Sequence, residues 1–241
     1  YKLDINADNL DIEVLVDRQS SDIALGVNIG GAGDQGMSYG YATNETPELL
    51  PIPFVLATRF LELLKIYPCR MLKADAKAQV SYDYDSGKIT TFLCSVQHTP
   101  DVEVEDFRPI IEKLMVRRFV LGSSFADCGV TGRKLACDTY GGIGHIGGGA
   151  MSGKDPSKVD RSGAYAARKI ARDVVSAGYA DKAEVQIAYA IGIAEPVSVY
   201  VESFGTEHQD KEFITQYVRE NYDLTPRGII ESLSLLDVNY N

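Results

Sequence analysis

GGIGHIGGGAMSGKDPSKVDRSGAYAAR, residues 141–168, combines a glycine-rich segment, a cluster of charges and a helical pattern in one stretch. Seven glycines stand between positions 141 and 153, and Lys154, Lys158 and Arg161 follow together with two aspartates. Backbone without side chains can wrap around an anion, and a helix N-terminus with nearby cations stabilises the negative charge. The stretch therefore predicts a phosphate-binding loop that leads into a helix.

The helix after this loop is predicted from its caps and its periodicity. Asp155 is the predicted N-cap, and Pro156 fits the first turn, where no amide hydrogen is needed. Gly178 is the predicted stop. One face is apolar at helical spacing and is predicted to pack inward. This face consists of Val159, Gly163, Ala166, Ala167, Ile170 and Val174.

Part of the loop also matches a Walker A motif. Gly148, Gly153 and Lys154 satisfy its G-x-x-x-x-G-K pattern, so a kinase or NTPase of that type is one alternative. Asp155, however, stands where that motif has the Ser or Thr whose hydroxyl holds magnesium. A carboxylate at this position favours a different kind of phosphate site. A flexible glycine loop before an ordinary amphipathic helix is the remaining structural alternative.

Composition and charge limit the classes of function. The 241 residues are enough for one large domain or two ordinary ones. A formal net charge of −10 argues against nucleic acid as the main partner. The sequence shows no signal peptide, no apolar run that would cross a bilayer and no C-x-x-C pair among its four cysteines. We therefore expect a cytoplasmic protein with no membrane contact.

Hydrophobic periodicity along the rest of the chain predicts an α+β fold. Helical patterns occupy four further segments, 51–65, 104–115, 211–220 and 225–236. Strand-like alternation occupies seven, 12–16, 79–83, 88–97, 119–121, 134–138, 185–191 and 197–201. Turn residues join 79–83 to 88–97 and 185–191 to 197–201 as adjacent strands. Such hairpins, with helices in separate runs, predict layers of mostly antiparallel sheet covered by helices.

Three other segments resemble the glycine-rich stretch. In each, a charged residue stands next to residues that let the backbone approach a ligand closely. They are 32–36, 73–77 and 127–134. Any one of them alone is equally compatible with a solvated turn. Four such segments on an acidic protein predict one shared site for a polyanion.

Several motifs closely resemble the methionine adenosyltransferase family, also called S-adenosylmethionine synthetases. The motifs are GAGDQG at 31–36, YGYATNET at 39–46, DAKAQV at 75–80, DCGVTGRK at 127–134, DTYGG at 138–142, GGGAMSGKDPSKVDRSGAYAAR at 147–168 and AYAIGIAEPVSVYVESFGT at 188–206. The resemblance covers nearly the whole chain, and the lysine-rich motif beside GAGDQG is highly specific.

The resemblance implies a two-step reaction. Methionine sulfur attacks C5′ of ATP and displaces tripolyphosphate, which is then hydrolysed to pyrophosphate and phosphate. Because sulfur is a good neutral nucleophile, catalysis must mainly stabilise negative charge on the leaving group. By motif match, Lys154, Lys158, Arg133 and Lys134 are the catalytic and phosphate-binding groups. Asp160 matches a magnesium ligand, and the family implies two Mg²⁺ ions and K⁺.

The same matches assign the substrate positions. Further ATP-binding positions are Asp34, Asp75, Ala76, Lys77, Arg118, Phe119, Asp127 and Ala150. Gln19, Asp127 and Lys158 match methionine-binding positions. The family also implies a homodimer or homotetramer with active sites shared between subunits.

The family architecture has three similar α+β domains. The resemblance divides this chain into a remnant of the first domain at 1–29, the central domain at 30–119 and an incomplete C-terminal domain at 120–241. The family's opening histidine-proline-aspartate-lysine segment and its C-terminal glycine-histidine-phenylalanine tail are not among the 241 residues. We expect that the sequence covers only part of a longer enzyme. A reduced homologue that binds nucleotide or regulates a partner without catalysis is the alternative.

Overall fold

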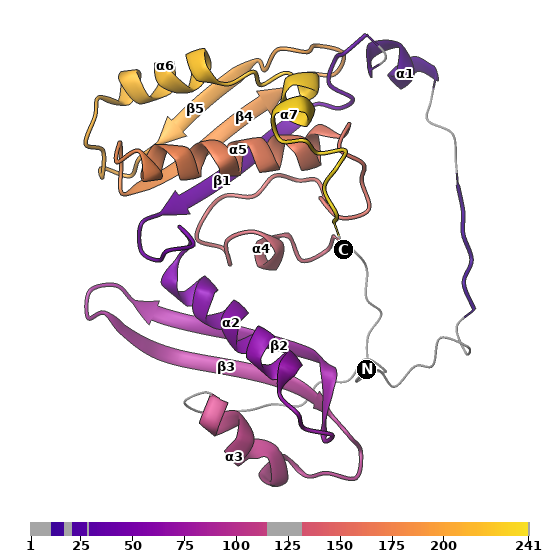
Figure 1. Cartoon of the computed structure of the whole chain (residues 1–241), viewed down its shortest axis with the longest axis vertical. Coiled ribbons are helices and arrows are strands. Elements are labelled where there is room, and N and C mark those ends of the chain that lie inside the picture. The colour runs from indigo at the N-terminus through magenta and orange to yellow at the C-terminus, as the bar shows by residue number, and fades with distance from the viewer. Residues whose placement is uncertain (1–10, 17–20, 28, 115–131, 241) are drawn as a thin grey trace. The chain divides into compact units, whose positions relative to one another are not determined.

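The computed structural model describes residues 11–16, 21–27, 29–114 and 132–240. The chain forms two compact units, one made of Tyr1–Val16 and Ile52–Gly129 and the other of Asp17–Pro51 and Val130–Asn241. We call the first the hairpin unit and the second the sheet unit. The elements in chain order (Figure 1) are α1 (Ser21–Val27), β1 (Gly36–Thr43), α2 (Ile52–Ile66), β2 (Leu72–Asp83), β3 (Lys88–His98), α3 (Val104–Leu114), α4 (Leu135–Asp138), α5 (Val159–Ser176), β4 (Lys182–Tyr189), β5 (Ser198–Glu202), α6 (Lys211–Asn221) and α7 (Pro226–Ser232).

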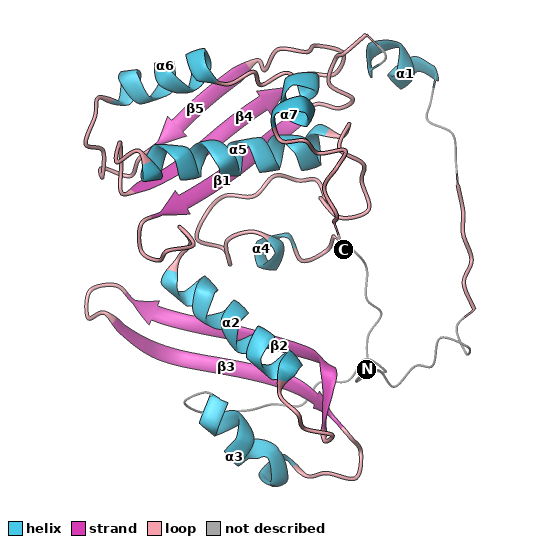
Figure 2. Cartoon of the chain, in the orientation of Figure 1, coloured by secondary structure: helices cyan, strands magenta, loops and turns pink. Residues whose placement is uncertain are grey.

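The hairpin unit consists of α2, β2, β3 and α3. Strands β2 and β3 pair antiparallel along most of their length (Figure 2). Phe60 and Leu64 of α2, Val96 of β3, and Phe107 and Ile111 of α3 are buried in one core. The predicted hairpin and both predicted helices are confirmed, although β2 begins seven residues before the predicted strand.

The sheet unit contains a three-stranded antiparallel sheet in the order β1-β4-β5. Gly36 of β1 lies opposite Tyr189 of β4, and Thr43 lies opposite Lys182. The pairing of the two strands predicted near 185–191 and 197–201 is confirmed. The first strand of this sheet comes from early in the chain, so distant segments of the sequence combine in one layer.

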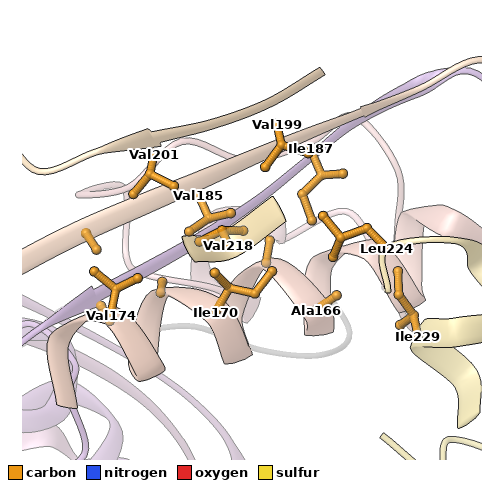
Figure 3. Packing of buried hydrophobic residues seen from close by; sticks show 14 of the residues in the cluster. Ala166, Ile170, Val174, Val185, Ile187, Val199, Val201, Val218, Leu224 and Ile229 are labelled. Atoms are coloured by element: carbon orange, nitrogen blue, oxygen red, sulfur yellow. The ribbon is translucent and has the colours of Figure 1, made fainter. Parts of the chain in front are cut away.

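The core of the sheet unit lies between one face of the sheet and the helices. Figure 3 shows Val185 and Ile187 of β4 pointing toward side chains of α5, and Val199 and Val201 of β5 belong to the same core. The face of α5 predicted to pack inward is buried throughout. Helices α6 and α7 contribute to the same core through residues that include Val218 and Ile229. The α+β fold with helix-covered antiparallel sheets is therefore confirmed.

Strand β1 is the main element that sequence periodicity misses. Its sequence, GMSYGYAT, contains two glycines, which weaken a strand and hide its alternation. The structure explains Gly40, because a Cβ atom there would lie 2.0 Å from the carbonyl carbon of Ala167 in α5. Glycine at this position lets helix and strand approach backbone to backbone.

Other strand predictions differ from the structure. Residues 135–138 form the single helical turn α4, in place of the predicted strand at 134–138. Five residues are too few for alternation to distinguish the two, and the Thr139 hydroxyl donates to the Leu135 carbonyl at 2.7 Å, which favours the turn. Residues 12–16 have no regular secondary structure, and 119–121 lie outside the described residues.

Gly40→Ala is expected to lower the free energy of unfolding by about 3 kcal/mol, at the upper end for overpacking. The neighbouring atoms are backbone atoms of α5, which cannot rotate away as a side chain can. Gly36→Ala, in the same strand, is the control, because its nearest neighbour would be 3.9 Å away. Urea denaturation of both variants checks the prediction, and equal losses of stability would contradict it.

The predicted domain boundaries at 29/30 and 119/120 stay a prediction. Among the described residues, no helix combines the length and the apolar character needed to span a bilayer.

Candidate active site

The glycine-rich segment, residues 141–153, is called the glycine loop below. It crosses the sheet unit on the face of β1 that points away from α5. Ser38 of β1 donates from its hydroxyl to the carbonyl of Val159 at 3.3 Å, which places Ser38 toward α5. Its neighbours in the strand therefore point to the opposite face. On that face a Cβ atom at Gly144 would lie 2.9 Å from Cβ of Tyr41. A Cβ atom at Gly147 would lie 2.5 Å from the carbonyl oxygen of Met37 in the strand backbone. The glycines allow the loop to lie directly on the strand.

The end of the glycine loop meets the first turn of α5. A Cβ atom at Gly149 would lie between 2.1 and 2.4 Å from the three carboxyl atoms of Asp160. Lys154 Nζ donates to Asp160 Oδ2, and the two side chains are only 32% and 23% exposed. The structure therefore brings the predicted phosphate-binding lysine and the predicted metal ligand together in a partly buried ion pair.

The start of α5 differs from the prediction in two respects. The helix begins at Val159, so Pro156 lies in the turn before the helix and not in its first turn. The N-cap is Lys158, whose side chain makes no capping hydrogen bond, so Asp155 does not cap the helix. Asp155 Oδ1 instead accepts from the Ser157 amide at 2.8 Å. Hydrogen bonding to Ser157, first from its side chain and then from its amide, lowers the pKa of the Asp155 carboxyl. The carboxylate thus stabilises the turn before the helix. The helix ends as predicted, because Gly178 follows the C-cap with φ of 71°.

The segment that carries Arg133 and Lys134 contacts the same loop. Gly132 has φ of 79°, and a Cβ atom there would lie 2.3 Å from Cβ of Ala150. Arg133 and Lys134 are both exposed to solvent. The two predicted cations therefore directly follow, in the chain, a glycine that contacts Ala150, four residues before Lys154.

Asp34 lies in the loop that leads into β1. Its side chain is exposed, and Oδ1 accepts from the Gln35 amide at 2.8 Å. Backbone hydrogen bonds of 3.0 and 2.8 Å join Ala32 to Ile193 and Gly192, which fixes this loop to the segment after β4. The start of β1 then reaches Asp160, because a Cβ atom at Gly36 would lie 3.9 Å from its Oδ1.

A buried carboxylate that the sequence did not single out also contacts the glycine loop. Glu184 on β4 is 8% exposed and accepts from both the amide and the ring Nδ1 of His145, at 2.8 and 2.6 Å. Burial first, and then the carboxylates of Glu45 and Glu184, raise the pKa of Tyr41 to about 12. The alternation of residues along β4 places Glu184 on the face of the sheet opposite the core. The glycine loop covers that face, and Glu184 is therefore buried.

Glu184→Ala is expected to reduce the free energy of unfolding by about 1–3 kcal/mol, because it leaves the His145 amide without its acceptor. Glu184→Gln keeps an acceptor oxygen and should lose less. His145→Ala is the matched control, since it removes the exposed ring but leaves the amide contact. Chemical denaturation orders the three variants, and a glutamine variant as unstable as the alanine variant would contradict the prediction.

Comparison with known proteins assigns the family. The sequence model for the S-adenosylmethionine synthetase central domain matches residues 29–131, and the model for the C-terminal domain matches residues 121–241. The chain belongs to the S-adenosylmethionine synthetase family. A solved structure, an unusual S-adenosylmethionine synthetase from Campylobacter jejuni, shares 34% sequence identity with a TM-score of 0.83. The similarity covers 97% of this chain and 67% of that chain. This confirms the predicted adenosyltransferase architecture.

The fold also argues against the Walker alternative. In a Walker-type NTPase the phosphate loop follows a strand of a parallel sheet and supplies a hydroxyl to magnesium. In this synthetase-family chain the three strands of the sheet unit are antiparallel. The Asp155 side chain is engaged in the turn before α5.

The remaining predicted site residues lie elsewhere. Asp75, Ala76 and Lys77 belong to β2 of the hairpin unit, with the two charged residues exposed and Ala76 packed against the core. Asp160 belongs to the sheet unit. Gln19, Arg118, Phe119 and Asp127 fall outside the described residues.

The residues around Asp160 fit a magnesium ion in one respect. Mg²⁺ in nucleotide sites is typically bound by one or two carboxylates together with phosphate oxygens and water. Asp160 supplies one carboxylate beside a glycine loop, and its Oδ1 is not the oxygen that Lys154 contacts. Within the described ranges, no three His, Cys, Asp or Glu side chains cluster as a metal site formed by protein alone. The donor set suits an ion that arrives with a phosphate ligand.

Proposed function

We propose that this chain acts in the formation of S-adenosylmethionine from ATP and L-methionine. The observation that carries the proposal is the Lys154–Asp160 pair, held between the glycine loop and the first turn of α5 in a member of the synthetase family. Arg133 and Lys134 directly follow Gly132, which contacts Ala150 of the same loop. This arrangement suits a leaving group with several negative charges.

The proposed reaction forms one bond and breaks one bond at C5′ of ATP. The methionine sulfur attacks C5′ and becomes a sulfonium, while the C5′–O bond breaks and its electrons remain on tripolyphosphate. Lys154, Lys158 and Arg133 stabilise the charge on this leaving group, and Arg133 can contact phosphate oxygens in a bidentate way. Lys134 adds a further positive charge next to Arg133. No general base is required, because the sulfur carries no proton.

The second step is the hydrolysis of tripolyphosphate. Water adds to one phosphorus atom, the phosphoanhydride bond breaks, and pyrophosphate and phosphate are released. The same cations hold the anion during this step. Magnesium, held by Asp160 and by phosphate oxygens, would neutralise part of the charge. A second Mg²⁺ and K⁺ belong to the proposal on the strength of the family resemblance alone.

The substrate-binding roles rest on the same resemblance. Asp34 and the 75–77 segment would bind the nucleotide together with Arg118 and Phe119. Gln19 and Asp127 would contact methionine. A homodimer or homotetramer with shared active sites, and a cytoplasmic location, are further parts of the proposal. An isolated monomer should therefore be inactive.

The test is product analysis after incubation with ATP, Mg²⁺ and K⁺, with and without methionine. S-adenosylmethionine, pyrophosphate and phosphate should appear only with methionine. ADP formed without methionine would instead indicate an NTPase. Nucleotide binding without any product would indicate a non-catalytic homologue. Measurement at several protein concentrations tests the dependence on the oligomer.

A further inference from the structure

Arg161 is the third residue of α5, and its guanidinium contacts three other groups. NH1 donates to the backbone carbonyl of Lys154. Nε donates to the hydroxyl of Tyr165 at 3.0 Å. The guanidinium carbon lies 3.9 Å from the centre of the Tyr240 ring. Arginine suits this position, because its planar group can donate in several directions while stacking on an aromatic face.

The contact with Lys154 holds the residue that pairs with Asp160. The first turn of α5 thus contacts Lys154 at both ends, the ammonium through Asp160 and the carbonyl through Arg161. The preceding residue, Gly153, has φ of 82°, and a Cβ atom there would meet nothing within 4 Å. The side of Gly153 on which a Cβ would stand is therefore open, whereas the Arg161 guanidinium donates to the carbonyl of the residue that follows.

Tyr240 connects the end of the described chain to this contact. Its ring stacks with that of Tyr165 at an interplanar angle of 14°, with 6.3 Å between centroids. Its hydroxyl donates to the Leu235 carbonyl at 2.7 Å, which ties the ring to the segment after α7. The guanidinium of Arg161 is consequently held by one ring face and one hydroxyl from two different segments.

We propose that Arg161 is a positioning residue that fixes the backbone of Lys154, and that Tyr240 in turn fixes Arg161. The structural part of this inference concerns Lys154 alone. Its consequence for turnover rests on the proposed function. Arg161 itself contacts protein groups, so its effect on the reaction passes through Lys154.

Chemical labelling tests the structural part without any substrate. The probe is acetic anhydride, and mass spectrometry measures the modification rate of Lys154 in the whole protein. In Arg161→Met the rate should rise about fivefold, the factor expected when one net hydrogen bond is lost. Lys169, which pairs with Asp173 on the same helix, is the internal control and should keep its rate. An unchanged Lys154 rate in a folded Arg161→Met protein would overturn the proposal.

Two variants at position 240 keep the test decisive if Arg161→Met fails to fold. Tyr240→Phe retains the ring face under the guanidinium, whereas Tyr240→Leu retains bulk but no aromatic face. We expect a clearly raised Lys154 rate in the leucine variant and a smaller rise in the phenylalanine variant, which loses only the hydroxyl bond to the Leu235 carbonyl. Equal rates in the two variants would overturn the role of Tyr240.

A double-mutant cycle tests the catalytic consequence. Arg161→Met alone should lower kcat about tenfold or more, because misplacing a group by 1 Å can cost on the order of 100-fold. In a Lys154→Met background the same change should cost little further, since the residue it positions is already lost. Additive losses would overturn the proposal. If the parent protein makes no S-adenosylmethionine but the labelling pattern holds, the proposed function fails and the structural inference stands.

Discussion

Lys154→Met should lower the rate of S-adenosylmethionine formation by about 1,000-fold, the upper range for removing one preorganised charge-stabilising group. The ammonium lies at the end of the glycine loop, paired with Asp160 and only 32% exposed. Methionine keeps an unbranched chain of similar length, so the packing of the stem is largely retained. The loss should appear in kcat more than in KM for methionine, because the charge that Lys154 stabilises grows as the C5′–O bond breaks.

Lys169→Met is the matched control for this variant. Lys169 lies on α5 as well and forms an ion pair with Asp173 one turn away, outside the glycine loop. Its removal should leave kcat within about twofold, since an exposed pair of this kind contributes well under 1 kcal/mol. Thermal unfolding should show both variants folded. If Lys154→Met retained a tenth or more of the parent rate, its assignment as a principal charge-stabilising group would be wrong.

The sequence predicted most of the fold because most elements carry regular periodicity. The inward face of α5 and the paired strands β4 and β5 follow patterns that local packing enforces. Strand β1 was missed for a tertiary reason. Its Gly40 is required by the backbone of α5, which is distant in the sequence, and a glycine inside a strand weakens the local pattern.

The site, like the fold, was predicted where local sequence patterns encode it and was missed where it depends on tertiary contacts. Glycines, lysines and an aspartate at fixed spacing made the loop and Asp160 recognisable, and the family motifs assigned their roles. The capping role given to Asp155 was wrong, because an aspartate before a helix can equally bind the amide two residues on. The contact of Glu184 with His145 depends on a loop crossing the sheet, and no local pattern encodes it.

Gly149→Ala should reduce kcat/KM for ATP by about 100-fold while leaving the protein folded, a loss typical of a reacting group misplaced by 1 Å. The added Cβ would lie 2.1 Å from Cγ of Asp160 and 2.3 and 2.4 Å from its oxygens. A carboxylate at the end of a side chain can rotate away, so the fold need not change. The rotation, however, separates Asp160 from Lys154 and moves the proposed magnesium ligand.

Two measurements separate this effect from a general disturbance of the loop. The Mg²⁺ concentration for half-maximal activity should rise in Gly149→Ala, because Asp160 no longer points to the proposed ion position. Gly148→Ala adds the same methyl group one residue earlier, where nothing lies within 4 Å, and should lose at least about tenfold less activity than Gly149→Ala. Equal losses in the two variants would show that crowding of the bound phosphates, and not displacement of Asp160, limits the reaction. An unchanged Mg²⁺ requirement would show that Asp160 is not a magnesium ligand, because the carboxylate cannot keep its position beside an alanine at 149.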